Sequence, residues 1–314
     1  MINPVNAVTL PATARIRIGI DLGGTKTEII ALDAGGGELL RRRRETPAEN
    51  YQAALELIAG MVGEAEAELG AVASIGIGAP GALSLATGVI KNSNSTCLNG
   101  RPLKQDLESH LGREIRMAND ANCFALSEAV DGAGAGASTV FGVILGTGVG
   151  GGIVIGGQVL VGANSIAGEW GHNPLPLPQA ADFPLPRCYC GRAGCVESYL
   201  SGPSLMRDHA IRTGEHLAPR EIAARAAAGD ANCEQTLARY EERLARALGT
   251  VINLIDPDVI VLGGGLSNLD RLYFNVPRLW GPGVFSDVVA TRLVPNRHGD
   301  SSGVRGAAWL WGGR

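Results

Sequence analysis

Two apolar segments that each pass through a short glycine turn into a second apolar segment constrain the fold of this chain more than any other feature. Residues 16–20 and 29–32 flank the first turn, and residues 139–145 and 152–155 flank the second. The order strand, glycine turn, strand predicts a β-hairpin in both places, and not a strand that leads into a helix. Because the two units begin roughly 120 residues apart, the sequence predicts a duplicated domain.

Hydrophobic periodicity and turn residues predict the remaining elements. Thr46-Pro47-Ala48-Glu49 has the chemistry of a helix start, with Thr46 as the capping residue. The proline-rich residues 174–187 predict an irregular loop. The sequence predicts further helices over 103–111, 121–130, most of 218–252 and 304–311, and strands over 73–78, 114–118 and 259–262.

Composition and charge exclude several classes of protein. The net charge of −4, from 27 basic and 31 acidic residues, provides no basic face for nucleic acid. No apolar run is long enough for a membrane span, and residues 1–15 resemble neither a signal peptide nor an anchor. We interpret residues 1–15 as a disordered extension, and Arg41 to Arg44 as a solvated strand end, with a phosphate or membrane patch as the alternative. The expected compartment is the cytoplasm.

The glycine turns are suited to phosphate, although neither matches a standard nucleotide motif. Gly19 begins a G-x-x-x-x-G pattern, but Thr25-Lys26 follows where a P-loop requires Lys-Ser/Thr. Residues 146–151 match G-x-G-x-x-G, yet a strand follows where a Rossmann fold requires a helix. Backbone N–H groups in such turns still form an anion-binding nest, and Asp21 beside the first turn is suited to Mg²⁺. The alternative is a plain hairpin turn.

Three other polar or glycine-rich positions each have a functional and a structural interpretation. Asp120 is suited to a general base that takes the proton of an attacking hydroxyl, or to the N-cap of the helix that follows. Glu197 lies two residues after a cysteine and is either held in place there or an exposed carboxylate at a helix start. Residues 263–265 are three glycines that either admit an adenine ring or form a simple turn.

Three clustered cysteines and one histidine predict a metal site. Cys188, Cys190 and Cys195, together with His172, supply a complete tetrahedral Cys₃His set for zinc. The C-x-C-x₄-C spacing differs from the common C-x₂-C, so the alternative is a loop with three free thiols. All four ligand positions come from the protein, so the predicted role is structural.

Residues 18–28, 119–123, 167–174 and 299–308 together resemble the ROK family of the actin-like ATPase superfamily. Within that family the sequence resembles bacterial fructokinases of the manno(fructo)kinase type, from Arg17 to the C-terminus. The resemblance implies an α/β protein with the actin-like ATPase (ribonuclease H-like) fold and two α/β domains around a cleft. We expect a small domain of residues 1–118 plus 300–314, and a large domain of residues 119–299 that carries the zinc loop.

The same resemblance implies a role for each candidate residue. Asp120 would be the catalytic base, and His172 would serve both zinc and the sugar. The sugar-binding residues would be Asn94, Asn119, Asp120, Glu169, His172 and Glu197. The phosphates would be held by Asp21, Gly23, Gly24, Thr25, Lys26, Gly146, Thr147 and Gly148, and the adenosine by Gly263, Gly264 and Gly265. The implied cofactors are ATP, Mg²⁺ and a structural Zn²⁺ bound by His172, Cys188, Cys190 and Cys195.

The expected function is the ATP-dependent phosphorylation of a free hexose at its 6-hydroxyl, with fructose as substrate and mannose second. The alternatives are a glucokinase, an N-acetylhexosamine kinase, or a sugar-sensing regulator that transfers no phosphate. The regulators of this family carry a helix-turn-helix domain before the kinase-like part, and a first strand at about residue 16 leaves no room for one. Relatives lead us to expect a homodimer, with no nucleic-acid or membrane partner.

Overall fold

The computed structural model describes residues 16–84, 86–93 and 95–312, which form two compact units. Unit 1 comprises Met1–Cys123 and Gly303–Arg314, and unit 2 comprises Phe124–Ser302. The predicted domain limits, at 118/119 and 299/300, lie a few residues from the observed ones. Asn119 and Asp120 therefore belong to unit 1, and not to the large domain as predicted. The predicted extension 1–15 and the candidate Asn94 lie outside the described residues.

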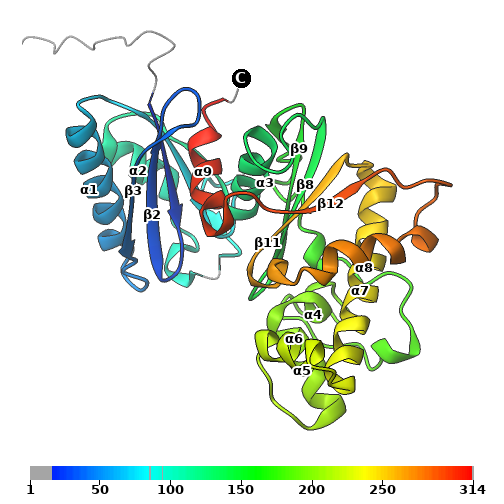
Figure 1. The fold of residues 1–314 in the computed structure, drawn as a ribbon. Helices are drawn as coiled ribbons and strands as arrows, with labels where there is room; N and C mark the ends of the chain where they lie inside the picture. The colour runs from blue at the N-terminus through cyan, green and yellow to red at the C-terminus, as the bar shows by residue number, and fades with distance from the viewer. Residues whose placement is uncertain (1–15, 85, 94, 313–314) are drawn as a thin grey trace, which may run out of the picture. The chain divides into compact units, whose positions relative to one another are not determined.

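Unit 1 contains a five-stranded mixed sheet of order β3-β2-β1-β4-β7 (Figure 1). β1 and β2 form the first predicted hairpin, with Ile20 opposite Ile29, and β4 and β7 extend the sheet in parallel. Its core lies between the sheet and two helices, α1 and α2. The elements are β1 (Arg17–Leu22), β2 (Lys26–Leu32), β3 (Glu38–Glu45), α1 (Tyr51–Leu69), β4 (Ser74–Ala79), β5 (Ala82–Leu83), β6 (Ile90–Lys91), α2 (Leu103–Leu111), β7 (Arg116–Asn119) and α9 (Ser302–Trp309).

Unit 2 repeats this strand pattern, with the order β10-β9-β8-β11-β12. β8 and β9 form the second predicted hairpin, and β11 and β12 extend the sheet in parallel. The repeated topology confirms the duplication predicted from the two glycine turns, and with it the α/β class. The elements are α3 (Asp120–Val130), β8 (Thr139–Leu145), β9 (Val149–Ile155), β10 (Gln158–Val159), α4 (Glu197–Leu200), α5 (Gly202–Thr213), α6 (Pro219–Ala227), α7 (Ala231–Ile255), β11 (Val259–Gly263), α8 (Arg271–Leu279) and β12 (Arg292–Pro295).

The predicted start of the first helix is wrong. α1 begins at Tyr51, and the side chain of Asn50 caps it by accepting a hydrogen bond of 3.1 Å from the backbone N–H of Ala53. The Thr46 hydroxyl instead donates to the carbonyl of Gly23, at 2.8 Å, so this residue fastens the first glycine turn. A capping motif is a local pattern, and here a hydrogen bond to a distant segment uses the hydroxyl that it requires.

The predicted helical region 218–252 consists of two helices, α6 and α7. Gly229 has a φ of 95°, which ends the first helix, and the carboxylate of Asp230 caps the second. The periodicity of the sequence did not predict β3, α5, α8 or β12. β3 carries charged residues at six of its eight positions and β12 has only four residues, so neither strand has a clear apolar pattern. The amphipathic helix α8 was overlooked although its apolar face is distinct.

The four arginines at 41–44 lie in β3, the edge strand of the unit 1 sheet. Their guanidinium groups form ion pairs with Glu28 and Glu38 and with two glutamates of α1, Glu64 and Glu68. The run is thus a charged edge strand whose side chains are paired with carboxylates. Among the described residues, no helix has the length and apolar character needed to cross a membrane.

Glycines let α9 pack directly on the unit 1 sheet. A Cβ on Gly19 of β1 would lie 2.0 Å from the carbonyl oxygen of Val304, and one on Gly76 of β4 would lie 1.8 Å from that of Ala307. Gly306 of α9 makes an equally close approach to the carbonyl of Cys123. No side chain fits at these positions, so the docking of the C-terminal helix depends on them.

Replacement of Gly76 by alanine is expected to destabilise unit 1 by about 2–3 kcal/mol, because the new methyl group would collide with the backbone of α9. The matched control is Gly60→Ala, at an exposed position of α1 where a Cβ meets nothing within 4 Å. That variant is expected to be neutral or up to about 1 kcal/mol more stable, because alanine favours the helix. Urea unfolding of both variants measures the difference, and equal effects would contradict the packing argument.

Candidate active site and metal centre

The first glycine turn joins β1 to β2 in unit 1. It is closed by a hydrogen bond of 3.0 Å from the N–H of Gly23 to the carbonyl of Lys26, and Thr46 holds its outer side. A Cβ on Gly23 would lie 2.7 Å from that same carbonyl. Gly24, Thr25 and Lys26 are exposed, so their backbone N–H groups are accessible to an anion.

Asp21, near the end of β1, lies in a small space bordered by glycines. A Cβ on Gly303 would lie 3.2 Å from Asp21 Oδ2, and one on Gly78 would lie 3.7 Å from Oδ1. Burial, and then the charges of Asp120 and Glu28, raise the pKa of Asp21 to about 7. Two carboxylates that disfavour each other's ionisation in this way suit a divalent cation, which relieves the repulsion.

Asp120 follows β7 and is the first residue of α3. Its Oδ1 accepts a hydrogen bond of 2.8 Å from the N–H of Ala121, and Asn119 Oδ1 accepts from the same group at 2.9 Å. The N-cap position therefore belongs to Asn119, whose amide also donates to the carbonyl of Gly81. The helix N-terminus favours a negative charge at Asp120, and the fold places this carboxylate at the end of a strand.

The second glycine turn, residues 146–148 in unit 2, is held by Glu197. A Cβ on Gly148 would lie 2.8 Å from Glu197 Oε2, and the N–H of Val149 donates to the same oxygen at 3.0 Å. Glu197 is the first residue of α4 and is half-buried. The interpretation of Glu197 as an exposed carboxylate is therefore wrong, because its side chain braces the turn.

The three glycines at 263–265 differ in what surrounds them. A Cβ on Gly263 would lie 2.5 Å from the ring of Phe124, and one on Gly264, whose φ is 79°, would lie 2.5 Å from the carbonyl of Leu145. Packing thus accounts for both of these glycines. A Cβ on Gly265 would meet nothing within 4 Å, so only this position leaves open space beside the backbone.

Glu169 and His172 lie on a segment that docks closely on β9. A Cβ on Gly171 would lie 2.1 Å from the carbonyl of Val149, and one on Gly168 would lie 2.4 Å from that of Gly151. Between these contacts, Trp170 is buried and donates its indole N–H to the carbonyl of Gly150 at 2.9 Å. These contacts fix the backbone immediately before His172, while Glu169 is exposed.

The structure brings His172, Cys188, Cys190 and Cys195 together, with one potential ligand atom from each lying within 4.8 Å of all the others. His172 Nδ1 lies 3.6 Å from Cys188 Sγ, and the sulfurs of Cys190 and Cys195 are also 3.6 Å apart. Bonds of about 2.3 Å to sulfur and 2.0 Å to nitrogen place the ligand atoms of a tetrahedral zinc site about 3.5–3.8 Å apart. The four residues therefore fit zinc, with Nδ1 as the histidine ligand.

The surroundings of these thiols also favour a cation. Burial raises the pKa of Cys195 to about 12 and also raises that of Cys188, whereas hydrogen bonds from Arg192 lower the pKa of Cys190 to about 6. Three thiolates this close together repel one another unless a metal ion neutralises them. Glu197 Oε1 lies 3.9 Å from Cys188 Sγ, so the carboxylate that braces the second glycine turn also touches this cluster.

Tyr189 is a neighbour of His172 that sequence reasoning missed. Its hydroxyl lies 3.0 Å from His172 Nε2, and the two rings meet edge to face with centroids 5.2 Å apart. With Nδ1 directed to the cysteines, Nε2 is the only other hydrogen-bonding position of the imidazole. The predicted contact of His172 with a sugar therefore requires the sugar to replace or share the Tyr189 hydroxyl. The only sequence signal for the contact of Tyr189 with His172 is that Tyr189 lies between Cys188 and Cys190.

Comparisons with known proteins agree with this architecture. The sequence profile of the ROK family matches residues 17–314. The chain is 40% identical over 296 residues to the N-acetyl-D-glucosamine kinase of Photobacterium profundum, covering 93% of this chain and 98% of that protein.

Two solved structures are similar over nearly the whole chain. The ROK hexokinase of Thermus thermophilus superimposes with a TM-score of 0.83 at 32% identity, covering 93% of this chain and 96% of that one. The ROK family glucokinase of Streptomyces griseus, in complex with glucose and AMPPNP, has a TM-score of 0.74 at 28% identity, covering 94% and 98%. These likenesses confirm the predicted fold.

Zinc binding can be tested by metal analysis. We expect about one zinc ion per purified chain. Cys190→Ser is expected to lose the ion. Its loss should lower the free energy of unfolding of unit 2 by about 3–4 kcal/mol, because a tightly bound ligand supplies stabilisation of this size. Cys97→Ser is the control, because Cys97 lies outside the cluster. Mass spectrometry of the metal content and urea unfolding measure both effects, and zinc retained by Cys190→Ser would contradict the assignment.

The raised pKa of Asp21 predicts a pH-dependent stability. Folded protein holds this proton more tightly than unfolded protein, so the stabilisation is complete below about pH 4 and is lost as the pH rises through 7. Asp21→Asn, which carries no charge, is therefore expected to be more stable than the natural chain at pH 8 without Mg²⁺, by about 1–3 kcal/mol, and similar at pH 4. Thermal unfolding at both pH values measures this, and an equal difference at both would refute it.

Proposed function

This chain belongs to the ROK family and is a sugar kinase, and we propose that it transfers the γ-phosphate of ATP to the 6-hydroxyl of N-acetyl-D-glucosamine. The observation that carries the proposal is the 40% identity to an N-acetyl-D-glucosamine kinase across almost the full length of both proteins. This likeness supports the N-acetylhexosamine alternative better than the expected fructose or mannose. The expectation of fructose rested on closeness of resemblance to fructokinases alone, and the residue types in the matching motifs do not report the substituent on the sugar.

The proposal assigns the catalytic base to Asp120 in unit 1. Its carboxylate takes the proton of the 6-hydroxyl as the hydroxyl oxygen forms a bond to the γ-phosphorus, and the bond from that phosphorus to the β-phosphate oxygen breaks to release ADP. The N–H of Ala121 orients the carboxylate, and the N-terminus of α3 favours its negative charge. Asn119, hydrogen-bonded to Gly81, is a sugar-binding residue beside the base.

The other sugar-binding residues of the proposal are Asn94, which lies outside the described residues, and Glu169, His172 and Glu197 in unit 2. Hydrogen bonds from a fixed set of carboxylates and an imidazole discriminate between sugars by geometry. The Cys₃His cluster supports them, because zinc on Nδ1 would fix the imidazole orientation and leave the proton on Nε2.

The phosphate-binding residues of the proposal lie at the two glycine turns. The N–H groups of Gly23 and Gly146 close the two turns, so the N–H groups of Gly24, Thr25, Lys26, Thr147 and Gly148 would hold the phosphates. Residues 263–265 would approach the adenosine, where only Gly265 leaves open space. Asp21 holds Mg²⁺ through water, and the ion supplies neutralisation of the charge on the transferred group when it is bound. The expected homodimer stays a prediction.

A coupled ADP-release assay with ATP and Mg²⁺ tests this function. Zinc-loaded protein is assayed with N-acetyl-D-glucosamine, glucose, fructose and mannose, and the largest kcat/KM is expected for N-acetyl-D-glucosamine. Asp120→Asn is expected to lower kcat about 10²- to 10⁴-fold, because the proton of the hydroxyl then has no base to accept it.

Asp287→Asn, the same exchange at an exposed position in unit 2, is the control and should leave kcat unchanged. A larger kcat/KM for fructose would overturn the sugar assignment and restore the earlier expectation. No turnover on any of the four sugars by folded, zinc-loaded protein would refute the kinase and favour a sugar-sensing regulator.

A further inference from the structure

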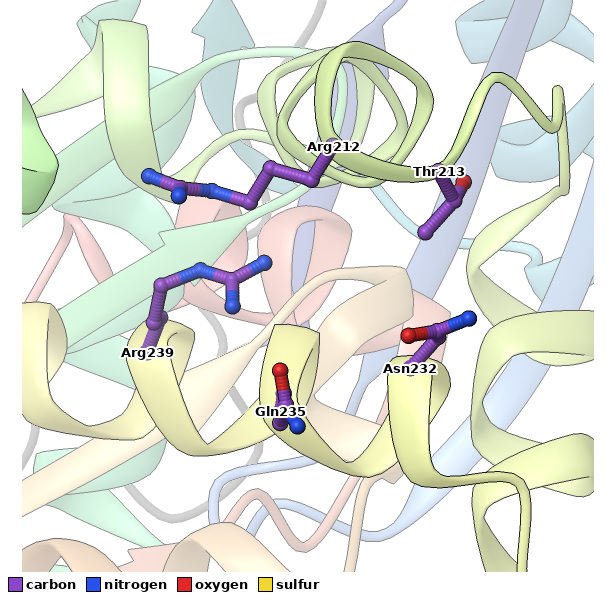
Figure 2. A pocket seen from close by; sticks show the side chains of 5 residues that line it. All are labelled: Arg212, Thr213, Asn232, Gln235 and Arg239. Atoms are coloured by element: carbon purple, nitrogen blue, oxygen red, sulfur yellow. The ribbon is translucent and has the colours of Figure 1, made fainter.

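A polar pocket of about 370 Å³ lies in unit 2, and none of the residues assigned so far lines it. Figure 2 shows that it lies between two helices, with Arg212 and Thr213 at the end of α5 and Asn232, Gln235 and Arg239 on α7. The volume is within the range of pockets that take small ligands. All five lining side chains are polar or charged, which distinguishes it from the apolar core around α7.

The two arginines belong to a network with an excess of positive charge. Asp208 pairs with Arg212, Arg239 and Arg243, at 3.5, 2.9 and 3.0 Å. Asp182 pairs with Arg243 and Arg246, each at 2.8 Å. Four guanidinium groups thus share two carboxylates, which leaves two positive charges that the paired carboxylates do not balance. The arginines hold the pKa values of both aspartates below the usual range, so this excess persists at neutral pH.

Unused donors remain on the pocket side of this network. Arg212 directs Nε to Asp208 and Nη2 to the carbonyl of Ala181, and Arg239 directs Nε and Nη2 to Asp208. Among residues 16–84, 86–93 and 95–312, the Nη1 amino group of neither arginine has a partner. The side-chain amides of Asn232 and Gln235 likewise make no hydrogen bond within the described part of the chain. The pocket therefore presents two cationic and two neutral donor groups.

A buried histidine links the two helices that line the pocket. His209 of α5 is 1% exposed, and its Nδ1 lies 3.0 Å from the hydroxyl of Thr236 on α7. Arg239 Nη2 lies 3.3 Å from the same hydroxyl, which links the arginine to the buried pair. His209 Nε2 has no hydrogen-bond partner among the residues that the structure describes. The contact between His209 and Thr236 thus links α5 to α7. The bond of Arg239 to the same hydroxyl positions this arginine before any ligand arrives.

We propose that this pocket binds the phosphate group of a small phosphorylated molecule. Guanidinium groups match the oxygens of phosphate in geometry and charge, and the pocket has two of them with unused donors. A dianion also neutralises the excess of two charges in the network. The amides of Asn232 and Gln235 then bond the remaining phosphate oxygens or the hydroxyls of an ester. The volume suits a small molecule, which excludes a protein or nucleic acid as the occupant.

Isothermal titration of inorganic phosphate into the full chain tests this inference. The protein is first saturated with Mg²⁺ and a non-hydrolysable ATP analogue, so that the glycine turns are occupied. One phosphate per chain is expected to bind, with a Kd of about 1 mM or below. Glycerol 3-phosphate, titrated in the same way, distinguishes an ester from the free ion: tighter binding identifies an ester as the ligand, and equal binding identifies free phosphate.

Gln235→Glu places a negative charge in the pocket at an exposed helical position and is expected to weaken binding at least about fivefold. Arg212→Gln, which removes an unused donor, should also weaken it. Gln158→Glu, the same charge change on the exposed β10, should alter the affinity less than about twofold. Absence of binding to the analogue-saturated protein, or equal affinity in the Gln235→Glu and Gln158→Glu variants, would overturn the proposal. Binding is measured without turnover, so either result is independent of the proposed kinase activity.

Discussion

Close approach of backbone to backbone at glycines is the constraint on which both units depend. In unit 1, Gly19 and Gly76 let α9 lie directly on β1 and β4. In unit 2, Gly151, Gly168 and Gly171 let the segment before His172 lie directly on β9. A methyl group at any of these positions would overlap a backbone atom, so the approach has no tolerance for a side chain. The position of the candidate sugar and metal ligands in unit 2 follows from this packing.

Glu197 couples two parts of unit 2 that have different chemistry. One carboxylate oxygen accepts the N–H of Val149 beside the second glycine turn, and the other lies against Cys188 of the metal cluster. A zinc ion bound by the four ligands would therefore support the turn as well as its own loop. A metal ion bound there would thus act directly on the second glycine turn, because a single side chain touches both. In unit 1, the Thr46 hydroxyl performs the corresponding task for the first turn.

Much of the fold was predictable because its strands are continuous apolar runs. The limits predicted for β8 and α2 are those observed, and the repeated hairpin indicated the duplication. The grouping of the Cys₃His residues was also predictable, since three cysteines within eight residues and a nearby histidine are the ligand types that zinc prefers. The cap at Thr46 was predicted wrongly, because the local pattern cannot report that the hydroxyl is used by a turn more than twenty residues away. The N-acetylhexosamine kinase hypothesis gained support only from similarity over the full length of a relative. The motifs predicted to bind phosphate do not distinguish between sugars.

The sequence by itself determined which residue types are available: a carboxylate after a strand at Asp120, glycine turns between paired strands, and three cysteines and a histidine suited to zinc. These follow from residue chemistry and spacing, which are local properties. Only the tertiary structure decided how they are held. It showed that Glu197 braces a turn, that Tyr189 lies against the second nitrogen of His172, and that one arginine of α5 and three of α7 share two carboxylates. Such contacts join residues far apart in the chain, and their energies depend on distances that spacing along the sequence does not contain.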